Sequence, residues 1–311
     1  MDKNMETQEP KKEIKEKKTF SEKFEVFHDK HYKHLLLIPL ILLVLSLGYM
    51  WVFYQQNNDF VLKDISLTGG TSVTLYEDVN LDDIKSTLSN SLEEISTREI
   101  YDLITGERKA VIIETKSSGE DTRDALETYL GHELNTDNSS FEFTGSTLSE
   151  SFFRQLLIAI LVAFIFMGVV VFIIFRTFVP GSAVVISAFA DIVMTLFVVN
   201  FFGFKMSSAG IVAFLMLIGY SVDTDILLTT RILKRSEGGL NQRIFGAFKT
   251  GVTMTLTSLL AVIFALIIVK SFSLILTQIF TILAIGLGFD ILNTWITNVG
   301  LLKWYVEAKT S

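Results

Sequence analysis

Four aspartates lie inside segments that are otherwise apolar enough to cross a membrane: Asp191, Asp223, Asp225 and Asp290. A charge near the centre of a bilayer costs about 3 kcal/mol on insertion scales, so a carboxylate kept there needs a use or a partner. Carboxyl groups in apolar surroundings can bind and release protons near neutral pH. All four histidines lie outside these segments, so a proton path would run through carboxylates, hydroxyls and water. The alternative is a static polar contact between helices.

Asp223 and Asp225 are predicted to point to opposite sides of one helix. Each residue turns about 100° around a helix axis, so the two side chains are about 200° apart. Asp225 shares its side with Ser221 and Thr229, and the residues on the side of Asp223 are Gly219, Tyr220 and Thr230. We expect both acids to exchange protons at a packed helix interface, with a structural polar lock as the alternative.

The next apolar segment offers a counter-charge and a run of hydroxyl groups. Lys249 lies at its start, and Thr253 and Thr257 follow on one side. This side could solvate a proton path, or it could serve only for close helix packing, which hydroxyl residues commonly provide. Lys249 is also explained as an anchor at the inner membrane boundary, and we expect Arg231 to mark that boundary.

The composition is typical of a membrane protein. Half of the 311 residues are hydrophobic and the mean hydropathy is +0.45, which is too apolar for an ordinary soluble protein. The absence of cysteine excludes disulfides, thiol catalysis and cysteine metal sites. No hydrolase triad, phosphate-binding loop or nucleic-acid patch is found. We therefore expect neither an enzyme nor a metal, a cofactor or a nucleic-acid partner.

Hydropathy divides the chain into two tails, six membrane spans and one large connection, because a crossing needs roughly 20 apolar residues. The predicted parts are an N-terminal tail (1–34), a first span (35–54), a separate domain (55–151), five further spans (152–302) and a C-terminal tail (303–311). The apolar runs are Leu35–Phe53, Phe152–Phe175, Ala183–Phe202, Ala209–Thr230, Thr250–Val269 and Phe272–Leu302.

Lysine and arginine gather in the two tails and in the connections after the second and fourth spans. Apart from the domain at 55–151, the other connections carry only Lys205 and Lys270. Positive charge favours the cytoplasmic side of a bilayer. We therefore predict a multi-pass protein of the plasma membrane with both termini in the cytoplasm and the domain outside.

The domain at 55–151 has the pattern of two strand–helix–strand units. Alternating residues in "GGTSVTLYE", "REIYDLI", "KAVIIETK" and "SSFEFTGST" predict strands, and "LDDIKSTLSNSLEEI" and "EDTRDALETYL" have helical spacing. The order β-α-β-β-α-β is that of a ferredoxin-like domain. Gly69 and Gly70 are better explained by a turn than by a phosphate cradle.

Several segments together resemble the SecF family of protein-export membrane proteins. The stretch "FFGFKMSSAGIVAFLMLIGYSVDTDILLTTR" is similar to the fourth-span signature of that family, in which Gly219, Tyr220 and Ser221 precede an acidic stretch ending in Arg. "LTGGTSVTL" resembles the glycine-pair segment that opens its external domain. "FADIVMT" and "FKTGVTMTLTSLL" resemble its third- and fifth-span segments. The similarity extends over about residues 61–300.

The resemblance implies a membrane α-helical half of the RND-like superfamily with one external domain. It implies SecD, a second six-span chain, as a partner, and assistance to protein export through the SecYEG channel. It also implies coupling to the proton gradient and an external domain that handles the translocating polypeptide.

The sequence departs from the bacterial pattern at several positions. The expected acid of the fourth span aligns with Thr224, which has an aspartate on either side, and Lys249 stands where an arginine is expected. Near the glycine pair, Ser66 replaces an aspartate, although Asp64 lies two residues earlier, and Asp290 replaces a small residue. These changes resemble the archaeal branch of the family.

Two other functions remain open: a scaffold of the export machinery without coupling, and an RND-like exporter of small molecules or lipids. Under the coupled hypothesis, we expect that removing the charge of Asp191 or Asp223 impairs export without dissolving the complex with the partner.

Overall fold

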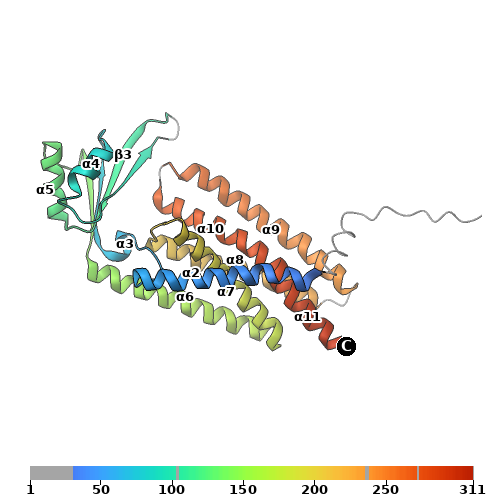
Figure 1. Ribbon diagram of the computed structural model, residues 1–311. Helices are drawn as coiled ribbons and strands as arrows, with labels where there is room; N and C mark the ends of the chain where they lie inside the picture. Colours follow the sequence, from blue (N-terminus) through green and yellow to red (C-terminus); the bar gives the residue numbers. More distant parts are fainter. Residues whose placement is uncertain (1–30, 103–104, 235–237, 272, 311) are drawn as a thin grey trace, which may run out of the picture.

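The structure is a computed structural model that describes residues 31–102, 105–234, 238–271 and 273–310. Most of the predicted N-terminal tail lies outside these residues. The described chain forms a bundle of long helices with a small α+β domain at one end (Figure 1). We call this end of the bundle the domain end. The C-terminus lies at the opposite end, which we call the tail end.

Six helices in the described residues are long and apolar enough to cross a membrane, as predicted. They are α2 (Leu37–Asn57), α6 (Ser146–Phe175), α7 (Phe178–Phe201), α8 (Ser208–Lys234), α9 (Leu240–Val269) and α10 (Leu274–Leu292), the last continued by the π-helix η1 (Asn293–Asn298) and by α11 (Val299–Thr310). At 30 residues, α6 and α9 are each about 45 Å long. Helix α9 begins at Leu240, ten residues before the apolar run at 250–269. Hydropathy does not detect these first turns, because they contain polar residues.

Helices α7 and α8 form the centre of the bundle. Within their most apolar windows, 56% and 50% of the residues are buried, against 11% for both α6 and α9. The outer helices therefore present most of their apolar surface away from the chain, toward lipid or a second protein. A carboxylate on the inner face of α7 or α8 is shielded from both, so its hydrogen-bond partners must come from the bundle itself.

The α+β domain is ferredoxin-like, as predicted. After the short helix α3 (Ile65–Thr68), its elements are β1 (Gly70–Leu75), α4 (Leu81–Leu88), β2 (Ser96–Tyr101), β3 (Arg108–Thr115), α5 (Gly119–Leu130) and β4 (Ser139–Thr144). The antiparallel sheet has the order β2-β3-β1-β4, with Val73 of β1 paired to Ile113 on one side and Phe141 on the other.

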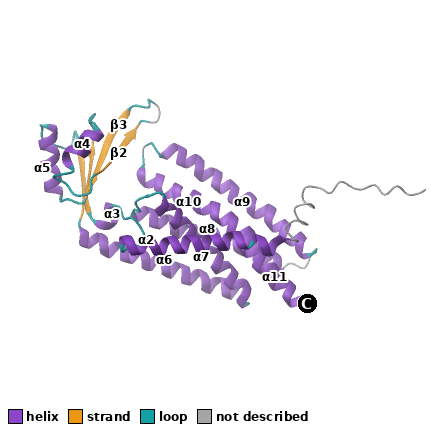
Figure 2. Ribbon diagram, in the orientation of Figure 1, coloured by secondary structure: helices purple, strands orange, loops and turns teal. Residues whose placement is uncertain are grey.

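Helices α4 and α5 cover one face of this sheet (Figure 2). Ile84 and Leu126 pack there against Val111 and other strand residues in one buried cluster. Helix α4 ends at Leu88, although apolar residues continue at helical spacing to Ile95. Leu92 is nevertheless buried, so the spacing reflects a core-facing turn and not a longer helix.

The domain is fastened to the bundle through α3. The backbone N–H of Asp64 donates to Met206 O at 3.0 Å, and that of Met206 donates to Leu62 O. The N–H of Ser208, the first residue of α8, donates to Ser66 Oγ at 3.1 Å. The entry to the domain and the start of α8 are therefore held together by hydrogen bonds.

The glycine pair is required by close backbone approach. Gly69 has φ +82° and Gly70 has φ +142°, both in the region that favours glycine. A Cβ on Gly69 would lie 2.5 Å from Ser146 Cα at the start of α6, and a Cβ on Gly70 would lie 2.3 Å from Thr115 O on β3. The pair therefore forms a tight junction between the sheet and the membrane helices.

We expect Gly70→Ala to destabilise the α+β domain by about 1–3 kcal/mol, the usual range for a strained backbone position. The measurement is hydrogen exchange of β1 and β3 in the full-length protein, which reports local opening. Gly145→Ala is the matched control, because a Cβ there meets no atom within 4 Å and φ is negative. Equal exchange in the two variants would contradict this explanation of the glycine pair.

Candidate functional site

Three of the four membrane aspartates meet inside the bundle. Asp191 on α7, Asp225 on α8 and Asp290 on α10 are all 0% exposed. The charge of Asp290 would interact with those of both other acids. We call these three residues, with the side chains that hydrogen-bond to them, the carboxylate cluster. Three like charges so close together and so deeply buried are unfavourable unless protons or donors compensate them.

Asp191 has a donor for each carboxylate oxygen. Ser221 Oγ on α8 donates to Asp191 Oδ2 at 2.6 Å, and Asn293 Nδ2 on η1 donates to Asp191 Oδ1 at 2.7 Å. One helix turn away, Thr195 Oγ1 donates to the backbone O of Asp191. Asp191 therefore connects α7 to both neighbouring helices.

Asp225 receives two donors on the same oxygen. Thr294 Oγ1 lies 2.9 Å from Asp225 Oδ1, and Asn298 Nδ2 donates to that oxygen at 2.7 Å. Its second oxygen, Oδ2, is buried and has no hydrogen-bond partner among the described residues. A buried carboxylate oxygen without a donor is costly, and protonation would relieve that cost.

The Thr294 hydroxyl is shared by two carboxyl groups. Its Oγ1 lies 2.9 Å from Asp225 Oδ1 and 3.1 Å from Asp290 Oδ1. A hydroxyl carries one proton, so it can donate to only one of these oxygens. The other contact becomes a hydrogen bond only when the carboxyl group itself carries a proton. This geometry therefore fits one proton held between Asp225 and Asp290. Thr255 Oγ1 on α9 reaches Asp290 Oδ2 at 3.5 Å.

The donors come from a π-helical segment that sequence reasoning did not single out. Asn293, Thr294 and Asn298 of η1 are each 0% exposed. The wider turn of a π-helix changes which side chains face inward, and such segments are frequent at functional sites. The polar residues of "FDILNTWITN" could have indicated an inward polar stripe, but α-helical spacing places only Thr294 with Asn298 and turns Asn293 about 140° away from Asn298.

Further buried oxygens surround Asp225 without a partner among the described residues. They are Asn298 Oδ1, Ser187 Oγ and Thr229 Oγ1. Asn298 is bonded to Asp225 through its amide nitrogen, and Thr229 lies one turn along α8. All of these oxygens can accept a hydrogen bond.

Asp223 lies outside this cluster, on the opposite side of α8 as helical geometry predicts. It is exposed on the surface of the chain, as are Gly219 and Tyr220. Thr224 is buried between the two faces, with its hydroxyl donating to Tyr220 O at 3.3 Å. The structure therefore separates the acids that the sequence places together.

The residues of α9 that the sequence indicates as candidates lie on its exposed side and not in the carboxylate cluster. Lys249, Thr253 and Thr257 are all exposed. Each threonine hydroxyl donates at 2.7 Å to the carbonyl four residues earlier in its own helix. Arg231, at the end of α8, instead donates through Nη1 to Gly246 O at 2.5 Å. It fastens α8 to α9 and does not reach the carboxylates.

Together with Tyr220 and Asp223 of α8, the exposed Lys249, Thr253 and Thr257 form what we call the polar outer face. Helices α8 and α9 pack against each other, so the two polar rows belong to neighbouring helices. An exposed aspartate in a membrane span is unfavourable against lipid. This face is therefore suited to contact with another protein.

A cleft of about 360 Å³ separates the open face of the sheet from the domain end of the bundle. Arg98 Nη2 lies 3.1 Å from Glu114 Oε2 on this face. Burial raises the pKa of the Glu114 carboxyl, and the Arg98 guanidinium opposes that shift. The N–H of Tyr101 donates to the backbone O of Ser271, which lies between α9 and α10. This hydrogen bond is a second connection between the sheet and the bundle.

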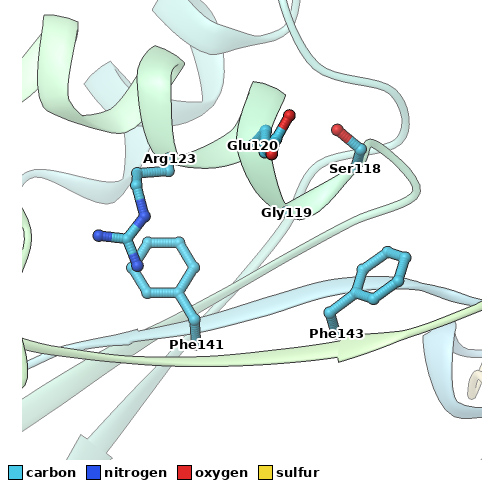
Figure 3. Close-up of a pocket in the computed structure, with 6 residues that line it drawn as sticks. All are labelled: Ser118, Gly119, Glu120, Arg123, Phe141 and Phe143. Atoms are coloured by element: carbon cyan, nitrogen blue, oxygen red, sulfur yellow. The ribbon is translucent and has the colours of Figure 1, made fainter.

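A second pocket, of about 410 Å³, lies on the helix-covered side of the sheet (Figure 3). The guanidinium of Arg123 stands over the Phe141 ring at 4.3 Å, and Phe143 is 64% exposed. Phe141 and Phe143 belong to β4, which is an edge strand in the described sheet. Edge strands offer unpaired backbone groups to an extended chain.

No group of three or more His, Cys, Asp or Glu residues in the described ranges is arranged to hold a metal ion. The carboxylate cluster has the groups needed to bind and transfer protons, through the oxygens and hydroxyls named above.

Comparison with known proteins agrees with this architecture. Residues 125–308 match the family model described as protein export membrane protein SecD/SecF, C-terminal. The chain is 39% identical to the protein-export membrane protein SecF of Methanocaldococcus jannaschii over 282 residues, covering 89% of this chain and 96% of that protein. It is also 39% identical to the SecF of Methanothermobacter thermautotrophicus, covering 90% and 95% of the two chains.

Two solved structures share the fold. The crystal structure of SecDF, a translocon-associated membrane protein from Thermus thermophilus, superposes with a TM-score of 0.69 at 20% identity. SecDF in a super-membrane-facing form gives a TM-score of 0.60 at 16% identity. The matches cover 89% and 90% of this chain, but the chain spans only 38% and 39% of those SecDF chains.

We expect Thr294→Val to destabilise the bundle, because it removes the hydroxyl shared by two buried carboxyl groups. The loss should be about 1–3 kcal/mol, the usual cost of leaving a buried polar group unsatisfied. Thermal unfolding of the full chain in detergent measures it. Thr257→Val is the matched control, since that hydroxyl is exposed and bonded within its own helix. Equal melting temperatures for the two variants would exclude a shared role for Thr294.

Proposed function

Because the chain belongs to the SecF group of the SecD/SecF protein-export family, we propose that it couples the export of polypeptides to the proton gradient. The observation that carries this proposal is the single hydroxyl of Thr294 between two buried carboxyl groups. Export membrane proteins form a transport family and not an enzyme family. The proposed setting is a SecYEG-type channel, with the α+β domain on the outer side and both termini in the cytoplasm.

The proposed proton site is the Asp225–Thr294–Asp290 bridge. With the proton on Asp290, its Oδ1–H donates to Thr294 Oγ1, and the Thr294 hydroxyl donates to Asp225. A shift of both protons along these bonds leaves Asp225 protonated and Asp290 charged, with no net change in the number of protons. In this second state, Asp225 Oδ1–H donates to Thr294 Oγ1, and the Thr294 hydroxyl donates to Asp290 Oδ1. Asp191 already has two donors, which supports a charged, fixed role.

The proposed mechanical output is motion of the α+β domain. Asp225 lies on α8, and the start of α8 is hydrogen-bonded to the α3 segment that enters the domain. Gly69 at the end of α3 packs on the start of α6. A change in how α8 sits among its neighbours would therefore be transmitted to the sheet without an additional linker.

SecD is the proposed partner, in keeping with the fused SecDF chains whose fold this chain shares. We propose that the polar outer face meets it. Asp223 there would gain donors from a second protein in place of lipid, and Gly219 would allow close packing. The competing idea of a self-sufficient exporter has less support, because the relatives that this chain matches are protein-export membrane proteins.

The translocating polypeptide is the proposed ligand of the outer domain. Edge strand β4 and the exposed Phe143 ring offer backbone pairing and an apolar contact without sequence preference.

We expect Phe143→Cys to cross-link to a precursor stalled in the channel. Absence of that product, with export intact, would exclude β4 as the contact.

For the coupling itself, we expect Asp225→Asn and Asp290→Asn to reduce precursor release to the level seen without a proton gradient. The measurement is release from energised membrane vesicles that contain the partner chain and the channel. Asp191→Asn should also lose gradient-dependent release, because it unbalances the charge next to the bridge. Asp82→Asn on α4 is the matched control, since Asp82 is exposed outside the membrane helices. Normal release in all three cluster variants, with assembly intact, would leave a non-coupled scaffold as the function.

For the partner face, we expect Asp223→Cys to cross-link to the SecD chain in membranes. The chain has no natural cysteine, so every product would come from the introduced one. Phe166→Cys on α6 is the control, because Phe166 is 67% exposed and only 11% of the most apolar window of α6 is buried. Cross-linking from position 166 but not from position 223 would place the partner on another face.

A further inference from the structure

A cavity of about 340 Å³ opens at the tail end of the bundle, away from the carboxylate cluster and the α+β domain. Its walls come from the end of α6, the end of α8, the start of α9 and α11. These segments lie near the C-terminus, at the end of the bundle opposite the sheet (Figure 1). The volume is within the range of about 300–1,000 Å³ that is usual for small-ligand sites.

Three cationic side chains line this cavity: Lys234 of α8, Arg243 of α9 and Lys309 of α11. No acid lines it among the described residues. The nearest acid along α11, Glu307, instead accepts a hydrogen bond from Tyr32 Oη at 2.6 Å. Among the described residues, the lining is therefore positively charged and offers no carboxylate that would oppose an anion.

The cations are held in place by the surrounding helices. Arg243 Nη1 donates to Ile232 O at 2.7 Å, which fixes the guanidinium beside the end of α8. The Lys234 ammonium lies 5.7 Å from the centre of the Phe175 ring. Lys234 and Lys309 are exposed, so their charged ends can reach an incoming group without a change in the helices.

Neutral groups add donors to the same cavity. Thr177 is the N-cap residue of α7, and its hydroxyl makes no cap hydrogen bond. This Oγ1 is buried and has no partner among the described residues. The N-terminus of α7 directs the positive end of the helix dipole to this place. Tyr305 also lines the cavity.

The rest of the lining is apolar, with Phe175, Ile232, Leu233 and Val306 beside the cations. A site for a free anion in water does not need such a wall, whereas a lipid brings both a phosphate group and acyl chains. The cavity lies where the membrane helices end, which is the level of lipid headgroups. Basic pockets between membrane helices at this level are suited to anionic lipid headgroups.

We propose that this tail-end cavity binds the phosphate group of an anionic phospholipid, with Lys234, Arg243 and Lys309 as the cationic contacts. The acyl chains would follow the apolar wall out toward the bilayer. The bound lipid would connect α6, α8, α9 and α11 at their ends. This site is independent of proton coupling and of the partner face.

The test is native mass spectrometry of the full chain released from mixed micelles of phosphatidylglycerol and phosphatidylcholine. We expect retained phosphatidylglycerol on the wild type, with little phosphatidylcholine. The double variant Lys234→Gln/Lys309→Gln should bind phosphatidylglycerol more weakly by roughly fivefold for each lysine removed, which is the effect of about 1 kcal/mol per basic residue. Arg243 is left unchanged, because its contact with Ile232 supports the fold.

The matched control is Lys205→Gln/Lys270→Gln, which removes two lysines at the domain end and should leave lipid retention unchanged. Inorganic phosphate at millimolar concentration should not displace the lipid. Equal retention by the wild type and the tail-end variant would overturn the proposal. Displacement of the lipid by inorganic phosphate alone would overturn the lipid as its source and leave a free-anion site.

Discussion

A buried carboxylate in a membrane bundle must find every hydrogen-bond partner inside the bundle, and the centre of this structure is organised around that constraint. Three aspartates from three helices meet inside the bundle, each 0% exposed at its surface. Their compensation comes from hydroxyl and amide groups, since none of the ion pairs in the described residues involves them. Because all of these donors are uncharged, the stability of the cluster depends on how many protons its carboxyl groups carry.

This constraint also explains why the last membrane helix is not a regular α-helix. Asp191 and Asp225 lie on neighbouring helices, and each needs a donor from the same third element. The π-helix η1 supplies Asn293 to the first, and Thr294 and Asn298 to the second. Close packing allows this element to approach: a Cβ on Gly251 of α9 would lie 2.3 Å from the Trp295 ring. The π-helical backbone of η1 and the small residue Gly251 therefore both help to bring these donors to the two aspartates.

The sequence was sufficient for the architecture but not for the site. Apolar runs near 20 residues predict the six spans, and alternation predicts the four strands, because both depend on burial of long segments. The opposite faces of Asp223 and Asp225 also follow from regular helix geometry. The full donor set does not, since α-helical spacing turns Asn293 about 140° away from Asn298, and nothing in the sequence indicates the π-helix η1. The end of α4 at Leu88 could not be predicted from the apolar spacing either, because Leu92 is buried without being helical.

Helix α8 has two chemically different sides, and this asymmetry connects the cluster to whatever packs outside. Ser221, Asp225 and Thr229 face the interior, while Tyr220 and Asp223 face the surface. A helix cannot turn one side without turning the other, so a protein seated on the outer side constrains where Asp225 lies relative to Thr294. Conversely, the proton state of the bridge alters the position that α8 prefers. The start of this helix is bonded to α3, so both influences reach the α+β domain through one rigid element.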